Sequence, residues 1–398
     1  MKKMKINKII SVFLGVFLIF LQFFCVFYTP INNKLLNNSS AIYKNINKKN
    51  ENKITSKGMI TIESNSGRIL YKKDENKRLP MASTTKILTA IVAIENCKNL
   101  DKKHKIPANS VGIEGSSIYL RENEHLSIRE LLYGLMLRSG NDSAVAIATI
   151  ISGSVENFVN LMNDFCKKLN LENTNIVTVN GLHNDNHYTT AYDLAMITRY
   201  ALSNEIFAEI VSTKNIKIDD ENAKNGVRYL KNKNKLLTIL EGADGVKTGY
   251  TKKAGKCFVG SATRGNMKII CVVLDCETMF DECLELIEKA FNNYKMIKLF
   301  ASGNISETTI VNDKKSQIIP VILKDDILYP LTKKEILIIK GKIIFNNNLT
   351  APISTNDEIG ELKIYLENNL IFSQKLYTIN VEKYKEKNLF KKIIKRFW

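Results

Sequence analysis

The chain has 398 residues, of which 44% are hydrophobic and 25% are charged; this balance excludes a disordered chain and allows two or three domains with a sizeable core. Its formal net charge is +18, and the basic residues gathered at both ends of the chain point to an anionic membrane or wall surface as a partner. Nucleic acid is the competing partner, but the sequence has no aromatic-interleaved basic patch and no zinc-finger spacing. We therefore expect no binding to nucleic acid.

The cysteines and histidines show no spacing that is typical of a metal site. Seven cysteines and four histidines are scattered without a C-x-x-C pair or an H-E-x-x-H motif. We therefore expect neither a zinc site nor any other metal or cofactor. Cys257 and Cys271 lie in apolar, strand-like runs, so most of the cysteines are interpreted as small core residues. A disulfide between any pair is the less favoured alternative.

The N-terminal segment has the pattern of an export signal. Residues 1–29 combine a basic start with an unbroken apolar run at 12–21, which predicts a secretory leader. Cleavage is the preferred outcome and retention as an anchor the alternative, because Gln22 interrupts the run before a comfortable membrane span. Residues 30–57 are rich in Asn, Lys and Ser and predict a flexible linker. We expect an exported protein at the outer face of the cytoplasmic membrane or in the cell wall.

Ordered structure is predicted from Gly58 onward. Two short apolar runs, 59–62 and 68–71, flank Asn65-Ser66-Gly67 and predict a β-hairpin. Later segments show helical or strand-like spacing of apolar residues. Helices are predicted at 87–93, 126–137, 141–150, 158–169, 192–202 and 282–295, and strands at 245–248, 257–263 and 267–275. This order predicts one α/β domain of the α+β type over residues 58–297, with helices packed on an antiparallel sheet.

The C-terminal third has a different pattern. Short alternating runs begin beyond about Leu299 and predict a small all-β domain over residues 298–382. Its strands are expected at 308–311, 317–323, 336–345, 362–366 and 370–376. Residues 383–398 place their apolar side chains on one helical face with lysines between them, which predicts an amphipathic helix on an anionic membrane surface.

One short stretch has the chemistry of an activated nucleophile. Ser83 and Lys86 form the only S-x-x-K of the chain, at the head of a predicted buried helix. Residues three apart share a helix face, so the Lys86 amine can reach the Ser83 hydroxyl. Burial among Ile and Val disfavours the ammonium form and leaves an amine that can accept a proton. For an isolated S-x-x-K, a helix start followed by a surface lysine would be the better interpretation.

Two later motifs change that judgement. Ser139-Gly140-Asn141 lies in the predicted helical block, and Lys247-Thr248-Gly249 lies on a predicted strand. Helix capping or a solvated strand lysine explains either motif by itself. The ordered set S-x-x-K, S-x-N and K-T-G is specific, because it belongs to the penicillin-recognising serine enzymes.

Residues 58 to about 380 resemble the serine-type D-alanyl-D-alanine carboxypeptidases, the low-molecular-mass penicillin-binding proteins. Segments 130–135 and 181–193 also resemble the family's pattern, and 247–257 matches it almost letter for letter. The resemblance implies a β-lactamase/transpeptidase-like catalytic domain without a cofactor. Peptidoglycan stem peptides ending in D-Ala-D-Ala would be its substrates and β-lactam antibiotics its acylating inhibitors. The chain departs from the family in one extra residue within Pro80-Met81-Ala82-Ser83 and in a diverged C-terminal β domain.

The resemblance also implies the catalytic roles. Ser83 would attack the carbonyl of the penultimate D-Ala, Lys86 would accept its proton, and Ser139 would relay that proton to the leaving amine. The like charge of Lys247 would help to keep Lys86 deprotonated. The backbone N–H groups of Ser83 and Tyr250 would form the oxyanion hole.

Five residues would bind the substrate according to the same resemblance. Asn141 would hydrogen-bond the substrate peptide amide, and Lys247 would attract the terminal carboxylate. Thr248, Gly249 and Tyr250 would align the peptide along their strand.

Three other activities remain as alternatives. A class A β-lactamase uses a deacylating glutamate between the second and third motifs; here no E-x-x-L-N segment occurs there, and Gly140 replaces the usual Asp. A D,D-endopeptidase or transpeptidase would differ only in the acceptor that reaches the acyl-enzyme. A non-catalytic wall-binding protein is disfavoured by the intact set of motifs.

Removal of residues 383–398 from a leader-less form of the protein should release it from anionic vesicles and leave activity on a soluble peptide unchanged. The apolar run is too short for a bilayer span, which needs about 20 apolar residues. Basic residues near an anionic surface contribute about 1 kcal/mol each. Vesicle co-sedimentation measures the effect. Binding that survives the deletion, or that ignores salt and lipid charge, would show the expectation to be wrong.

Overall fold

The computed structural model describes residues 54–220, 226–312, 315–346, 349, 353–379 and 385–386. The predicted leader, nearly all of the predicted linker and most of the predicted C-terminal helix lie outside these residues.

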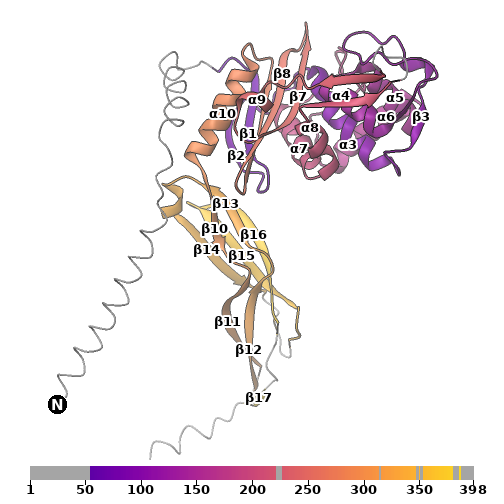
Figure 1. Cartoon of the computed structure of the whole chain (residues 1–398). Helices are drawn as coiled ribbons and strands as arrows, with labels where there is room; N and C mark the ends of the chain where they lie inside the picture. Colours follow the sequence, from indigo (N-terminus) through magenta and orange to yellow (C-terminus); the bar gives the residue numbers. More distant parts are fainter. Residues whose placement is uncertain are drawn as a thin grey trace, which may run out of the picture. The chain divides into compact units, whose positions relative to one another are not determined.

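A five-stranded antiparallel sheet forms the centre of the larger domain, with the strand order β2-β1-β9-β8-β7 (Figure 1). Its strands are β1 (Gly58–Glu63), β2 (Ile69–Lys73), β7 (Ala243–Thr251), β8 (Gly255–Arg264) and β9 (Met267–Leu274). The first hairpin of the domain therefore pairs directly with its last strands. The predicted hairpin, the three later strands and the antiparallel sheet are confirmed.

The helices lie in the order that the apolar spacing predicts. They are α3 (Lys86–Asn96), α4 (Ile128–Leu137), α5 (Asn141–Ser152), α6 (Val155–Lys168), α7 (Ala191–Leu202), α8 (Glu205–Ser212), α9 (Leu236–Ile239) and α10 (Met279–Asn293). Side chains cap four of the starts, those of α4, α6, α7 and α8. Ser127 and Glu130 form a capping box on α4, and Thr190 accepts a hydrogen bond from the backbone N–H of Asp193 on α7. The short helices α8 and α9 were not predicted.

Two short hairpins and two 3₁₀ turns complete this domain. They are β3 (Lys103–Lys105) with β4 (His125–Ser127), β5 (Asn215–Asp219) with β6 (Val227–Lys231), η1 (Ala82–Thr85) and η2 (Ala108–Ser110). The sequence analysis missed both hairpins, because strands of three to five residues give little periodic signal.

Both faces of the sheet are buried, and β9 shows this directly. Ile270, Val272 and Leu274 pack in the core shared with α3 to α8, whereas Ile269, Cys271 and Val273 pack in a second core with α10. Successive side chains of a strand point to opposite faces, so one continuous apolar run serves both cores. Figure 1 shows α10 and the α3–α7–α8 group on opposite sides of the sheet.

The nucleophile segment differs from the prediction in one respect. Ser83 lies in the 3₁₀ turn η1, and the α-helix begins at Lys86. The hydroxyls of Thr84 and Thr85 donate to the carbonyls of Met81 and Ala82, at 2.6 and 2.7 Å. Such local side-chain bonds favour a tight turn over a regular helix.

The C-terminal residues form a separate β-rich module (Figure 1). Its elements are β10 (Lys295–Phe300), β11 (Gly303–Asn312), β12 (Lys315–Leu323), β13 (Ile327–Leu331), η3 (Glu335–Leu337), β14 (Ile339–Phe345), β15 (Glu358–Leu366), β16 (Asn369–Tyr377) and β17 (Lys385–Glu386). β10 pairs with β13, and a second sheet has the order β11-β12-β16-β15-β14 with β17 on β12.

The observed strands differ from the predicted ones in several places. β10 begins at Lys295, before the boundary placed at residue 298, and the strand predicted from 336 begins at Ile339 because η3 precedes it. β17 takes up Lys385–Glu386, so these two residues of the segment predicted as a helix, 383–398, are a strand. β13 contains Pro330, which conceals a strand in the sequence.

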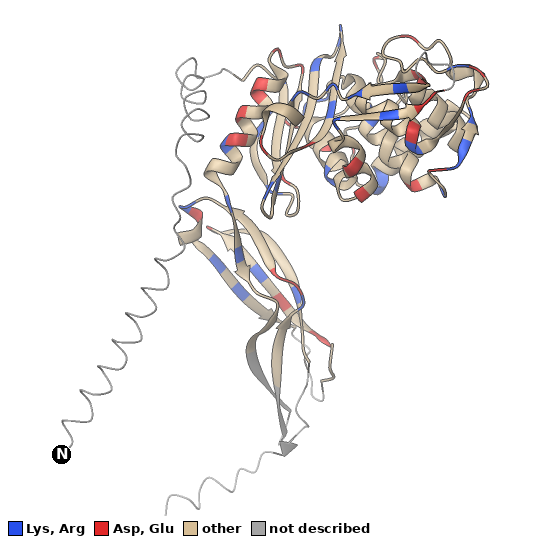
Figure 2. Ribbon diagram, viewed as in Figure 1, with Lys and Arg blue, Asp and Glu red and all other residues tan. Residues whose placement is uncertain are grey.

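Basic residues are spread over the helices, the central sheet and the β-rich module (Figure 2). Of the described cysteines, all six are unpaired, and all but Cys97 are buried, as expected for small core residues. Within the described ranges, no single helix is long and apolar enough to cross a membrane; α5 and α6 meet that criterion only as a pair bent by 87°.

Glu282→Gln should destabilise the protein by about 1–3 kcal/mol at neutral pH, because this carboxylate holds the start of the domain. It accepts hydrogen bonds from the backbone and side chains of Thr55 and Ser56. Burial raises the pKa of Glu282, but the bonds from Ser56, Thr55 and Cys276 outweigh it and hold the pKa below its ordinary value of 4.5.

Since the folded pKa is depressed, this contribution should be complete above about pH 4.5 and lost as the pH falls through the folded pKa. Urea unfolding at pH 7 and below pH 4 measures it, with the neighbouring exposed Asp281→Asn as the control. A difference between wild type and Glu282→Gln that persists at low pH would contradict this account.

Candidate active site

The nucleophile and its base meet at the junction of η1 and α3. Lys86 is fully buried, and its Nζ lies 3.0 Å from the Ser83 Oγ. The spacing of three residues brings the two groups together because the turn and the first residue of the helix share one face.

Two further acceptors surround the Lys86 amine. Its Nζ donates to the Asn141 Oδ1 at 2.7 Å and to the backbone carbonyl of Asn180 at 2.5 Å. A neutral amine has two N–H groups, which these carbonyl oxygens take up. Its lone pair then faces the hydroxyl of Ser83.

The electrostatic environment of Lys86 favours that neutral form. Burial holds its pKa well below the ordinary value, and the charges of Lys247 and Lys233 lower it further, whereas the charge of Asp142 opposes the shift. Lys86 therefore has the protonation state that a general base requires.

Asn141, the first residue of α5, is fixed from three directions. Besides accepting from Lys86, it donates from Nδ2 to the Glu114 carbonyl and from its backbone N–H to the Ser116 carbonyl, both at 2.6 Å. Because all of these groups are protein atoms, its amide has a defined orientation beside Lys86.

Ser139 is the predicted catalytic residue with the weakest structural support. It is 5% exposed, lies two residues before α5 and has a left-handed backbone with φ 64°. Its hydroxyl makes no hydrogen bond with another residue in the described part of the chain. Its place at the site therefore rests on its chain position two residues before Asn141.

Lys247 lies on β7 and is 2% exposed. Its Nζ donates to the backbone carbonyl of Thr248 at 2.9 Å. Burial, followed by the charge of Lys233, lowers the pKa of Lys247 to about 7. The free site therefore holds only a partial positive charge on Lys247 at neutral pH.

The rest of the K-T-G motif passes directly over η1. A Cβ at Gly249 would lie 3.0 Å from the backbone nitrogen of Ser83 and 3.1 Å from that of Thr84, so a side chain at this position would push the backbone of η1 away by a few tenths of an ångström. Thr248 is half-buried beside it. Tyr250 is 65% exposed and leads out of the site.

The sequence analysis missed two contributors to the site. The Asn180 carbonyl has no side-chain signature, although Gly181-Leu182 was noted as part of the resemblance. Lys233 donates to the Ser116 Oγ at 3.1 Å, and burial with the charge of Arg138 lowers its pKa. No local signal could have selected it, because it is one of several lysines in Lys231–Lys235.

His187 and Asp193 make contacts that support a structural role. The His187 Nδ1 accepts from the backbone N–H of Val177 at 3.0 Å, and its Nε2 lies 2.8 Å from the Thr85 Oγ1. Burial lowers the pKa of His187 to about 4, so the ring is neutral. Asp193 accepts from the hydroxyl of Thr174 at 2.8 Å.

Comparison with known proteins assigns both parts of the chain. The family profile described as D-alanyl-D-alanine carboxypeptidase matches residues 45–278, and that of the penicillin-binding protein 5 C-terminal domain matches residues 294–383. The chain is 33% identical over 315 residues to the D-alanyl-D-alanine carboxypeptidase DacF of Bacillus subtilis strain 168, covering 77% of this chain and 80% of that protein.

Solved structures give the same result. Penicillin-binding protein 5 from Haemophilus influenzae has a TM-score of 0.71 and 28% identity, covering 84% of this chain and 99% of its own. A mutant form of the Streptomyces K15 DD-transpeptidase has a TM-score of 0.56 and 33% identity, covering 61% of this chain and 98% of its own.

Lys233→Gln should raise the pKa values of both Lys86 and Lys247, because the charge of Lys233 lowers each of them. Carbon-13 NMR of labelled lysine side chains would follow the two titrations. Lys231→Gln, which removes an exposed charge two residues away, serves as the control. Unchanged titrations in Lys233→Gln would show that this cation does not act on the site.

Proposed function

This chain belongs to the D-alanyl-D-alanine carboxypeptidase family, and we propose that it removes the terminal D-alanine of peptidoglycan stem pentapeptides through an acyl-enzyme on Ser83. It is a serine peptidase of the penicillin-binding type. The observation that carries the residue assignment is the buried Lys86 amine 3.0 Å from the Ser83 hydroxyl, with its N–H groups bound elsewhere.

In the acylation step, the Ser83 Oγ attacks the carbonyl carbon of the penultimate D-Ala while its proton passes to the Lys86 Nζ. The developing oxyanion would accept hydrogen bonds from the backbone N–H groups of Ser83 and Tyr250. Each such donor contributes roughly 3 kcal/mol to transition-state stabilisation. The close approach at Gly249 supports this geometry, because it brings the β7 backbone next to η1.

In the second half of the step, the peptide bond between the penultimate and the terminal D-Ala breaks. The nitrogen of the terminal D-Ala takes up the proton that Lys86 accepted from Ser83. Ser139 would relay this proton from Lys86, and D-alanine leaves with a free amine. Water then attacks the ester on Ser83, with Lys86 again as the base, and releases the shortened peptide. Asn141 would hold the substrate amide during both attacks.

Lys247 would bind the terminal carboxylate of the substrate, and Thr248 would align the peptide beside it. The pKa of Lys247 is about 7 in the free protein. The negative charge of a bound substrate carboxylate favours the ammonium form of Lys247 and so raises this pKa. Substrate binding is then accompanied by proton uptake above neutral pH.

Transpeptidation is the second candidate, favoured by the similarity to the K15 DD-transpeptidase. The two activities share the acyl-enzyme and differ in the acceptor. Mass spectrometry of a purified stem pentapeptide, incubated with and without an added amino-acid acceptor, separates them: loss of one alanine supports hydrolysis, and incorporation of the acceptor supports transfer.

A β-lactamase is less well supported. None of the hydrogen-bond partners of Lys86 in the described part of the chain is a carboxylate that could activate water for rapid deacylation. β-Lactam antibiotics should therefore remain bound to Ser83 as acylating inhibitors.

The place of action is part of the proposal. The family association with penicillin-binding proteins supports export, with the substrate in the peptidoglycan outside the cytoplasmic membrane. The basic, amphipathic pattern of residues 383–398 supports attachment to an anionic membrane surface.

Ser83→Ala should abolish both labelling by a fluorescent penicillin and release of alanine, with the fold retained. The hydroxyl is the only group lost, and the methyl group that remains fits the same space. Labelling after gel electrophoresis and circular dichroism measure the two properties. Turnover within tenfold of wild type would exclude Ser83 as the nucleophile.

Lys247→Gln should reduce kcat/KM for a substrate with a free terminal carboxylate by about 10–100-fold, which corresponds to a charge-assisted contact of about 1.5–3 kcal/mol. An amidated substrate already lacks this contact, so the substitution should affect it little. In wild type, kcat/KM for the free carboxylate should also fall above pH 7 as the ammonium is lost. Equal losses on both substrates would contradict the role of Lys247.

A further inference from the structure

Residues 114–124 run past the start of α5 and carry two atoms that the site uses. The Glu114 carbonyl accepts from the Asn141 side chain, and the Ser116 Oγ accepts from Lys233. Gly115 lies between them with φ 92°, and a Cβ there would lie 2.7 Å from the Asn141 Nδ2. The positions of Asn141 and Lys233 therefore depend on where this loop lies.

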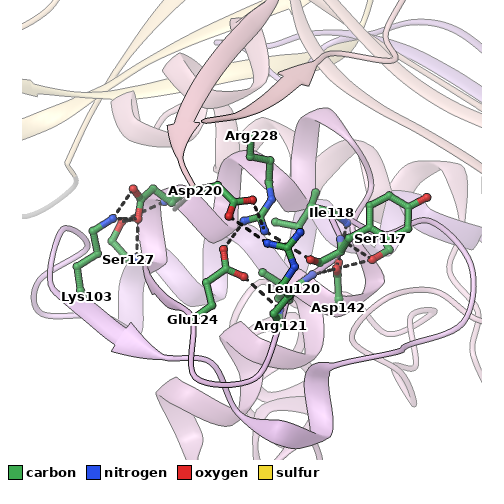
Figure 3. Close-up of polar contacts among 12 residues, drawn as sticks. Lys103, Ser117, Ile118, Leu120, Arg121, Glu124, Ser127, Asp142, Asp220 and Arg228 are labelled. Atoms are coloured by element: carbon green, nitrogen blue, oxygen red, sulfur yellow. Dashed lines mark hydrogen bonds and ion pairs between the residues drawn. The ribbon is translucent and has the colours of Figure 1, made fainter. Parts of the chain in front are cut away.

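Asp142, the second residue of α5, holds the next part of the loop and has no role in the steps described above. Its carboxylate accepts from the Ser117 hydroxyl at 2.5 Å and from the backbone N–H groups of Ile118 and Leu120 at 3.0 and 3.2 Å (Figure 3). The backbone N–H of Ser143 donates to its other oxygen at 2.8 Å. The carboxylate thus crosslinks the loop to α5 at several points.

The burial of this group is unusual for a carboxylate. Asp142 is 1% exposed, and within the described ranges it forms no ion pair. A buried charge without a countercharge is costly unless many donors surround it. Here the carboxylate accepts its hydrogen bonds from N–H and O–H donors of the loop and from the backbone N–H of Ser143 on α5, and these neutral donors hold the negative charge.

The far end of the loop is fixed by a second polar cluster. Arg228 on β6 forms ion pairs with Glu124 at 2.8 Å and with Asp220 at 3.2 Å, and Arg121 also contacts Asp220 (Figure 3). With Arg228 at one end and Asp142 at the other, the loop has one defined path past Asn141.

We propose that Asp142 is a positioning residue for the reaction: its carboxylate fixes residues 117–120 and thereby places the Glu114 carbonyl and the Ser116 hydroxyl that orient Asn141 and Lys233. The inference rests on the proposed acylation of Ser83. Asp142 also contributes its negative charge near Lys86 and supports the ammonium form there.

The test compares three variants by the rate of Ser83 acylation with a fluorescent penicillin across a range of pH. Asp142→Asn should reduce the rate by between about tenfold and 100-fold, the scale of effect when a catalytic group is misplaced by about 1 Å. The acid limb of its rate–pH curve should move to lower pH. The negative charge of Asp142 raises the pKa of Lys86, so removing that charge lowers the pKa. Ser117→Ala removes one donor and keeps the charge, so it should give a smaller loss and an unshifted limb.

The control is Asp164→Asn on α6, which removes the same charge at an exposed position and should match wild type in both respects. The rate constant separates positioning from stability, since in a merely less stable protein the labelled fraction falls while the folded molecules react at the wild-type rate. The acid limb separately reports the lost charge of Asp142. If Asp142→Asn has the rate and pH profile of wild type, the inference is wrong. Labelling of the wild type in the same experiment would still support the proposed function. An unlabelled wild type would overturn both.

A double-mutant cycle tests the path through Lys233. If the loop carries the effect, Lys233→Gln should cost less acylation rate in an Asp142→Asn background than in wild type, because Lys233 has already lost its oriented partner. If Asp142→Asn fails to fold, Ser117→Ala takes its place in the same cycle. Additive losses in the cycle would overturn the inference.

Discussion

The structure depends on one buried amine. Lys86 is fully enclosed, and the free energy of placing a charge there is high enough to favour the neutral form. The neutral form has two N–H groups, which the protein binds, and one lone pair, which faces Ser83. The same burial that would be a defect in an ordinary core thus produces both the protonation state and the direction of the base.

The partners of this amine come from separate parts of the chain. Asn141 begins α5, the Asn180 carbonyl belongs to the loop before α7, and Lys247 reaches the site on β7. The central sheet makes this assembly possible, because its last strands pair with its first hairpin and bring β7 over η1. Burial and the charge of Lys233 lower the pKa values of both Lys86 and Lys247. The site therefore gathers lysine side chains without a carboxylate, among the described residues, close enough to balance them, and the terminal carboxylate of a substrate can supply that negative charge.

Much of the fold could be predicted because its elements are amphipathic or continuously apolar. The helices α4 to α7 and the strands β7 to β9 have runs long enough to show their period, and their caps are encoded locally, as at Ser127 and Thr190. The hairpin β5–β6, the short helix α8 and the proline-containing β13 escaped prediction. Their lengths are short and their stability comes from tertiary contacts, which local spacing does not report.

The sequence by itself determined the ordered motifs, and with them the pairing of Ser83 with Lys86, because residues three apart meet on any helical turn. Only the tertiary structure decided which other groups surround that pair. The Asn180 carbonyl is a backbone atom without a signature, Lys233 is one lysine among several, and Asp142 resembles an ordinary helix-start carboxylate until its loop is in place. Their roles arise from distances between residues far apart in the chain, and those distances exist only once the sheet and helices have packed.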